Sequence, residues 1–182
     1  MSDNKKSVKY NKFMCDLYNC LYSMENDNKN IVILCIGTNK MIGDCFGPLV
    51  GEKLKEKFSK GSGLISVYGD LENPIVFDKI KSVLKGIRKK YKNPYIISVD
   101  AALASESNVG KIIVKKKAIG LGKSLKTNEI KVGDISIRGI IGKDYKNYEE
   151  NVFSLQSTSL YMVNELACIV GNGIIEVFRQ FE

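Results

Sequence analysis

Apolar residues follow two periods along this chain, one typical of buried strands and one typical of amphipathic helices. Continuous β-rich apolar runs predict strands at residues 31–36, 64–68 and 95–99. Helical spacing predicts helices at residues 10–23, from Pro48 onward and at residues 76–91. Strands and helices therefore alternate, which predicts a three-layer α/β/α fold with a mostly parallel central sheet.

The pattern changes in the last third of the chain. Two further strands, expected to add mixed or antiparallel edges, are predicted at residues 109–115 and 135–141, with a Gly- and Lys-rich loop at 118–133 between them. A last helix is expected from about Ser154 or Gln156, with Gly171 and Gly173 marking a break or a weakened turn.

Length and composition favour one domain, because 182 residues of which 44% are hydrophobic suffice for one sizeable core. Residues 1–9 are polar and predict a flexible tail, so the domain is expected to span residues 10–182. The chain starts without an apolar signal region, and its apolar runs are short for a membrane span, so a cytoplasmic protein without membrane contact is expected. Five cysteines without paired spacing indicate neither a disulfide framework nor a zinc site.

The absence of histidine is the most restrictive feature of the composition. Catalytic triads, Cys-His pairs and most metal centres depend on imidazole, so carboxylates, amines, thiols or backbone groups must supply any chemistry. The net charge of +8 comes mainly from scattered lysines, with clusters at residues 88–90 and 115–117. These clusters lack interleaved aromatic residues and are typical of a solvated face, so nucleic acid is not an expected partner.

Two aspartates are the main candidates for chemistry. Asp44 follows the first predicted strand and Asp100 follows the third. Ligands of open parallel sheets bind beyond the carboxyl ends of the strands where the strand order reverses, and the commonest small order places strand one between strands two and three. The two carboxyl groups are then expected to meet, with one protonated and the other charged, as an acid and a base that activate water. Taken singly, either aspartate is equally well explained as a helix cap or turn.

Other residues surround this predicted crevice. Gly43 and Gly47 allow close backbone approach at a helix start, and Asn39 and Glu72 are further candidates for substrate contacts. Whether Glu72 or Asp70 joins the site stays open, since an ordinary turn explains both. Cys45 is expected to pack rather than attack, because the neighbouring carboxylate disfavours its thiolate.

No cofactor is expected, because the glycine-containing loop at residues 37–43 matches neither common nucleotide-binding fingerprint. No dedicated metal site is predicted. A weaker alternative is metal-assisted hydrolysis with Asp44, Glu72 and Asp100 as oxygen ligands.

Several motifs together resemble the YyaC family of sporulation proteins. They are Ile36-Gly37-Thr38, residues 43–51, Val67-Tyr68-Gly69, Ser98-Val99-Asp100-Ala101 and residues 132–137. That family is similar to the germination protease, which degrades small acid-soluble spore proteins, and more distantly to hydrogenase maturation endopeptidases. The resemblance implies a phosphorylase/hydrolase-like fold, a cytoplasmic location in the forespore or mother cell, and catalytic roles for Asp44 and Asp100.

The chain departs from these relatives in two ways. It is shorter than the germination protease, and it lacks the histidine of the nickel-recognition site in the hydrogenase enzymes. Two hypotheses follow: an aspartate-dependent endopeptidase acting on protein or peptide substrates, such as small acid-soluble spore proteins, or a binding or regulatory protein of sporulation that keeps the fold without cutting. The sequence does not define an oligomeric state.

Overall fold

The computed structural model describes residues 2–22, 30–58, 64–121 and 129–179. The strands are β1 (Ile31–Cys35), β2 (Ile65–Tyr68), β3 (Tyr95–Ala104), β4 (Ile112–Lys115), β5 (Ile119–Leu121), β6 (Ile130–Val132) and β7 (Ile135–Lys143). The helices are α1 (Ser2–Leu21), α2 (Phe46–Phe58), α3 (Ile80–Lys90), α4 (Tyr148–Ser157) and α5 (Leu160–Phe178). Short 3-10 turns form at η1 (Gly43–Cys45), η2 (Phe77–Lys79) and η3 (Glu106–Asn108).

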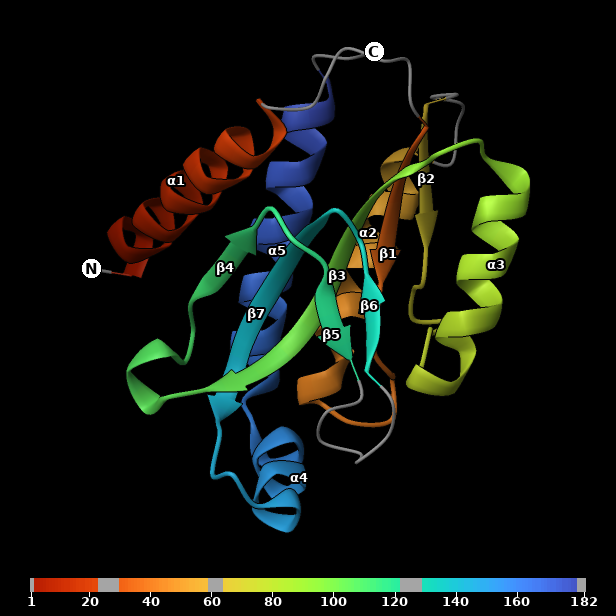
Figure 1. Ribbon diagram of the computed structural model, residues 1–182. Helices are drawn as coiled ribbons and strands as arrows, with labels where there is room; N and C mark the ends of the chain where they lie inside the picture. Colours follow the sequence, from red (N-terminus) through yellow and green to blue (C-terminus); the bar gives the residue numbers. More distant parts are fainter. Residues whose placement is uncertain (1, 23–29, 59–63, 122–128, 180–182) are drawn as a thin grey trace.

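The central sheet has the strand order β2-β1-β3-β7-β4 (Figure 1). Its first four strands are parallel, and β4 pairs antiparallel with β7. The α/β fold with a mostly parallel sheet is therefore confirmed. The order also places β1 between β2 and β3, as expected, so the carboxyl ends of β1 and β3 are neighbours.

Two hydrophobic clusters lie on opposite faces of the sheet and define the layers. On one face, α1, α2 and α5 pack against the sheet through buried residues that include Phe13, Val50 and Val170. On the other face, α3 and the β5–β6 pair cover the sheet through residues that include Leu84 and Ile119. Side chains that alternate along β1 and β3 enter the two clusters in turn, which is the pattern expected for strands buried on both faces.

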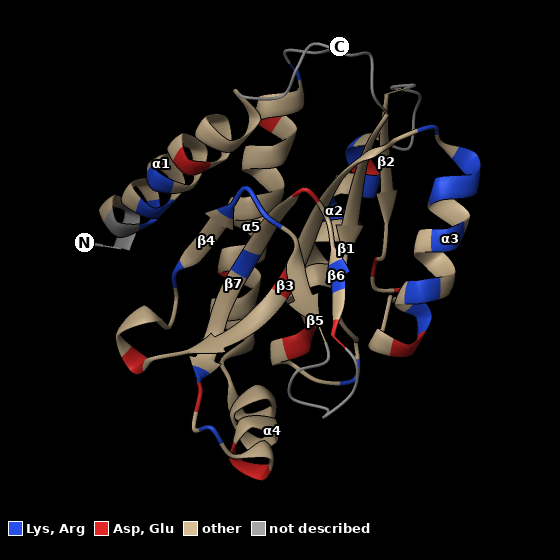
Figure 2. Ribbon diagram, viewed as in Figure 1, with Lys and Arg blue, Asp and Glu red and all other residues tan. Residues whose placement is uncertain are grey.

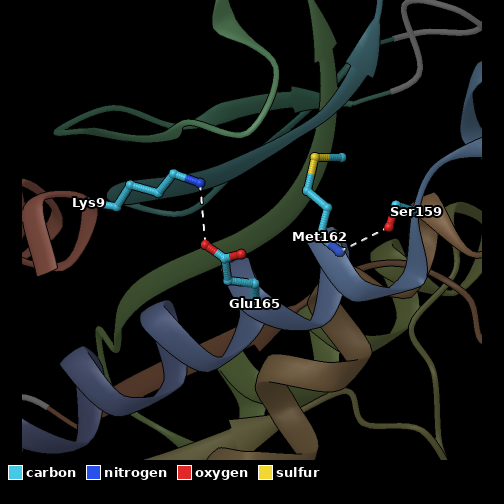
Figure 3. Close-up of polar contacts among 4 residues, drawn as sticks. All are labelled: Lys9, Ser159, Met162 and Glu165. Carbon is cyan, nitrogen blue, oxygen red and sulfur yellow. Dashed lines mark hydrogen bonds and ion pairs between the residues drawn. The ribbon is translucent and has the colours of Figure 1, made fainter. Parts of the chain in front are cut away.

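The predicted tail at residues 1–9 was wrong in its local structure, because α1 begins at Ser2. The first half of this helix is held against α5. Lys9 Nζ lies 3.3 Å from Glu165 Oε1 (Figure 3), and the Tyr10 hydroxyl donates a hydrogen bond to Glu176. Contacts with α5, which is distant in sequence, thus stabilise the first part of α1. The polar residues at the start of α1 gave no sequence signal for a helix.

The C-terminal segment forms two helices instead of one. Thr158 and Ser159 separate them, and Ser159 Oγ accepts a hydrogen bond from the Met162 backbone N–H at 3.4 Å (Figure 3), which caps α5. Of the two alternatives predicted at Gly171 and Gly173, a break or a weakened turn, the break was wrong, because α5 runs through both. A Cβ atom at Gly173 would press on the ring of Phe13, so this glycine permits close packing of α1 on α5.

The structure differs from two of the strand and loop predictions. β3 continues to Ala104 instead of ending at residue 99, because β7 pairs with it to that point. The expected loop at residues 118–133 contains β5 and β6, and residues 122–128 of it lie outside the described part of the chain.

Lysine and arginine residues recur along α3 (Figure 2), and Arg88, Lys89 and Lys90 in its last turn are exposed. Among the described residues, α5 alone is long and apolar enough to cross a membrane by length and composition, with a mean hydropathy of 1.3. Core helices meet the same criterion, and the buried residues of α5 pack against α1, α2 and the sheet.

Candidate active site

Asp44 lies in η1, between the end of β1 and the start of α2. The chain reaches it through a reversal in which the Thr38 backbone N–H donates a 3.1 Å hydrogen bond to the Asp44 carbonyl. Gly37 makes this reversal possible, because its φ of +143° is strained for other residues and a Cβ atom there would overlap the same carbonyl. The loop therefore fixes Asp44 at the carboxyl end of the sheet.

Asp100 lies within β3 and not beyond it, which corrects its predicted place at the strand exit. It is the register partner of Arg138 in β7, so the two side chains lie side by side on one face of the sheet. This is the face covered by α3, since Ile96 on the same side of β3 packs in that cluster. Both Asp100 and Arg138 are partly buried.

The charge of Asp44 acts on the Asp100 carboxyl group. Burial, and then the negative charge of Asp44, raise the pKa of Asp100 from 3.8 to about 8. The cation of Arg138 and a hydrogen bond from the Ala101 backbone N–H oppose this rise. Burial also raises the pKa of Asp44, against a hydrogen bond from the Thr38 backbone that lowers it.

The pKa of both carboxyl groups is raised, and that of Asp100 reaches about 8. With a pKa of about 8, Asp100 is mainly protonated at neutral pH and can donate a proton. The negative charge of Asp44 is one of the causes that keep the proton on Asp100, so the pair holds one proton in this state. The arrangement can supply one acid and one base without imidazole.

The two predicted glycines are packed against the protein. A Cβ atom at Gly47 would overlap the backbone of Ile36, so this glycine lets α2 start directly against β1. A Cβ atom at Gly43 would press on Leu155 of α4 and Ile141 of β7. Both glycines set the position of η1, and their contact with substrate stays a prediction.

Asn39 and Glu72 are exposed near the same end of the sheet. Asn39 Nδ2 donates a 2.8 Å hydrogen bond to the Leu71 carbonyl, which ties the loop after β1 to the loop after β2. Asp70 is 2% exposed, pairs with Lys55 and accepts a hydrogen bond from the Asn73 backbone N–H. Asp70 therefore stabilises its turn, and substrate contacts of Asn39 and Glu72 stay predictions.

The alternative metal centre is not assembled. Within the described ranges, no three His, Cys, Asp or Glu side chains are grouped so that they could hold a metal ion, and this includes Asp44, Glu72 and Asp100. Burial and the charge of Asp44 raise the pKa of the Cys45 thiol, which disfavours a nucleophilic thiolate, in line with the packing role expected for it.

Arg138 is the site residue that sequence reasoning missed. The sequence offered one signal for the role of Arg138: it is a single cation inside the apolar run of residues 135–141. A charged residue in a buried strand usually has a partner. Its partner could not be read from the sequence, since the register between β3 and β7 was unknown.

Comparisons with known proteins place this chain in a family. A family model described as "Protein of unknown function (DUF1256)" matches residues 2–173, and the chain belongs to that family. It is also similar to a protein of Bacillus subtilis (strain 168) described as "Uncharacterized protein YyaC", with 35% identity over 147 residues. This match covers 80% of the chain and 68% of that relative, and membership of the YyaC family is thereby confirmed.

Proposed function

We propose that this protein is an endopeptidase in which Asp44 and Asp100 activate water against a peptide bond. The observation that carries the proposal is the placement of the partly buried Asp100 in β3, which η1 with Asp44 contacts, so that burial and the charge of Asp44 raise the pKa of Asp100 to about 8. An acid and a base at one end of the sheet are what peptide hydrolysis requires of a site without histidine. The resemblance to the germination protease supports the reaction class, and small acid-soluble spore proteins are the proposed substrates.

In the proposed reaction, each aspartate transfers a proton once as the tetrahedral intermediate forms and once as it collapses. The Asp44 carboxylate takes a proton from water as the water oxygen bonds to the peptide carbonyl carbon, and Asp100 donates its proton to the carbonyl oxygen. The tetrahedral intermediate then collapses, the C–N bond breaks, and the proton taken by Asp44 passes to the leaving amine. Asp100 recovers its proton from the intermediate hydroxyl, so the pair ends in its starting state.

The test is mass spectrometry of purified small acid-soluble spore proteins incubated with the full chain across acidic to neutral pH. We expect discrete fragments with the unsubstituted protein, and at least about a hundredfold slower cleavage with Asp44→Asn or Asp100→Asn. Asp78→Asn is the matched control, because Asp78 is an exposed aspartate in η2 and is not a member of the proposed catalytic pair. Equal cleavage by all four proteins would contradict the proposal.

The same assay separates the alternatives. Cleavage that persists in excess chelator excludes a metal-dependent reaction. A stable complex with intact substrate, and no fragments at any pH, would favour a binding or regulatory protein on this fold.

A further inference from the structure

β3 extends beyond the strand that flanks it on one side. Its pairing with β1 ends at Val99, which is the register partner of Cys35. Its pairing with β7 continues to Ala104. The five residues from Asp100 to Ala104 are therefore paired on one side only among the described residues, and Figure 1 shows β3 continuing past the end of β1.

The backbone hydrogen bonds of β3 show which groups face the open side. The Tyr95 N–H bonds to Asn30 and the Val99 carbonyl accepts from Ile36, both on the β1 side. The Ile96 and Ala104 carbonyls accept from residues 134 and 144 on the β7 side. The register between β3 and β7 shifts between Ala102 and Leu103, but the extra residue lies in β7, so the alternation along β3 continues. The backbone groups of Ala101 and Leu103 therefore point to the side where β1 has ended.

Most of these backbone groups make no hydrogen bond to another described residue. The Ala101 N–H bonds to the Asp100 carboxyl group. The Ala101 carbonyl and both backbone groups of Leu103 have no hydrogen bond to another described residue on this side. Residues 101–104 are partly exposed and include neither proline nor a charged side chain, two of the devices that protect a strand edge from pairing.

The open edge begins at the candidate active site. Asp100 is its first residue, and η1, which carries Asp44, contacts β3. Strand edges bind extended peptides through main-chain hydrogen bonds, with alternate side chains of the peptide on opposite faces. Ala102 and Ala104 leave room for such side chains on the face of Asp100, while Leu103 packs into the core on the other.

We propose that the substrate binds as an added strand along the edge of β3 from Ala101 to Ala104, which brings its peptide bond to Asp44 and Asp100. The proposal rests on the function proposed above and specifies the form in which the substrate is held. An extended, locally unfolded segment is the required substrate class, and recognition runs mainly through its backbone.

N-methyl scanning tests this binding mode on the intact protein. Short overlapping peptides covering a small acid-soluble spore protein are bound to the full-length Asp44→Asn variant, and the tightest is resynthesised with one backbone nitrogen methylated at a time. Strand pairing predicts losses of about tenfold or more at every second position, with little change at the positions between. Losses without this alternation, or none at all, would overturn the proposal.

Two substitutions of Leu103 test the same edge from the protein side. Leu103→Pro removes the outward N–H, whereas Leu103→Ala removes the same side-chain packing and keeps the N–H. We expect the proline variant to lose peptide affinity about tenfold or more relative to the alanine variant. Equal affinity of the two folded variants would count against the edge, and the N-methyl scan decides the question if the proline variant does not fold.

The binding readout is independent of cleavage. Alternating sensitivity without cleavage by the unsubstituted protein would sink the proposed hydrolysis and keep the edge as a peptide-binding site. Cleavage without alternating sensitivity would support the proposed hydrolysis and exclude the edge of β3 as the peptide-binding site.

Discussion

Asp100 combines a central position in the sheet with an unfavourable setting for its charge. Burial and Asp44 oppose ionisation, and Arg138 compensates only in part, so the pKa is raised from 3.8 to about 8. A structural carboxylate is normally placed so that its charge is stabilised, as Asp70 is by Lys55. The contrast between these two aspartates favours a chemical role for Asp100.

The raised pKa predicts a pH-dependent effect of Asp100→Asn on stability. The folded protein holds this proton more tightly than the unfolded chain. Asp100 therefore does not destabilise the folded state below about pH 4, and its destabilising effect grows as the pH rises to about 8. We expect the variant to match the unsubstituted protein near pH 4 and to exceed it by on the order of 5 kcal/mol near pH 9, because the pKa differs by about four units between the folded and unfolded states. Urea denaturation across this range measures the difference.

Asp78→Asn serves as the control, because Asp78 is exposed. An Asp100→Asn effect that stays constant from pH 4 to pH 9 would show that it arises from packing and not from the titration of Asp100.

The sequence was sufficient to predict that Asp44 and Asp100 lie near the carboxyl ends of neighbouring strands, because both lie in or next to clear β-rich runs, and their catalytic role stays a prediction. It was not sufficient to place Asp100 inside its strand, since that depends on how far β7 follows β3. Arg138 was missed for the same reason. Side-chain neighbours across a sheet are set by register, which a single sequence does not record.

At the scale of the elements, the approach of α2 to the strand ends determines where Asp44 lies. Gly47 is one point of close approach, where a Cβ atom would overlap the carbonyl oxygen of Ile36. We expect Gly47→Ala to lower the free energy of unfolding by about 2–4 kcal/mol, since the overlap is with backbone and cannot be relieved by a rotamer change. Chemical denaturation measures the loss.

Gly86→Ala is the matched control in α3. Gly86 is exposed and an added Cβ atom would meet nothing within 4 Å, so we expect a gain of up to about 1 kcal/mol from better helix propensity. Similar losses in both variants would argue against the close contact of α2 with β1.

The elements themselves were predictable where apolar periodicity was long and continuous, as in β1 and α3. They were less predictable where tertiary contacts decide. The start of α1 depends on Glu165 and Glu176 of α5, and the continuity of α5 through Gly171 and Gly173 depends on neighbours that fill the space beside them.

At the scale of the whole molecule, the strand order explains why the two aspartates converge. Placing β1 between β2 and β3 makes the ends of β1 and β3 adjacent, although Asp44 and Asp100 are far apart in sequence. This part of the architecture followed from alternating strands and helices. The β5–β6 pair, which covers the face on which Asp100 lies, was expected only as a loop, because its strands are three residues each.

Titration of the Asp100 carboxyl group by NMR of the protein labelled with ¹³C-aspartate tests the coupled aspartate pair most directly. We expect a midpoint of about 8 in the unsubstituted protein, and a lower midpoint, still above 3.8 because burial remains, in Asp44→Asn. A midpoint near 3.8, or one that Asp44→Asn leaves unchanged, would contradict the pair and the hydrolytic mechanism built on it.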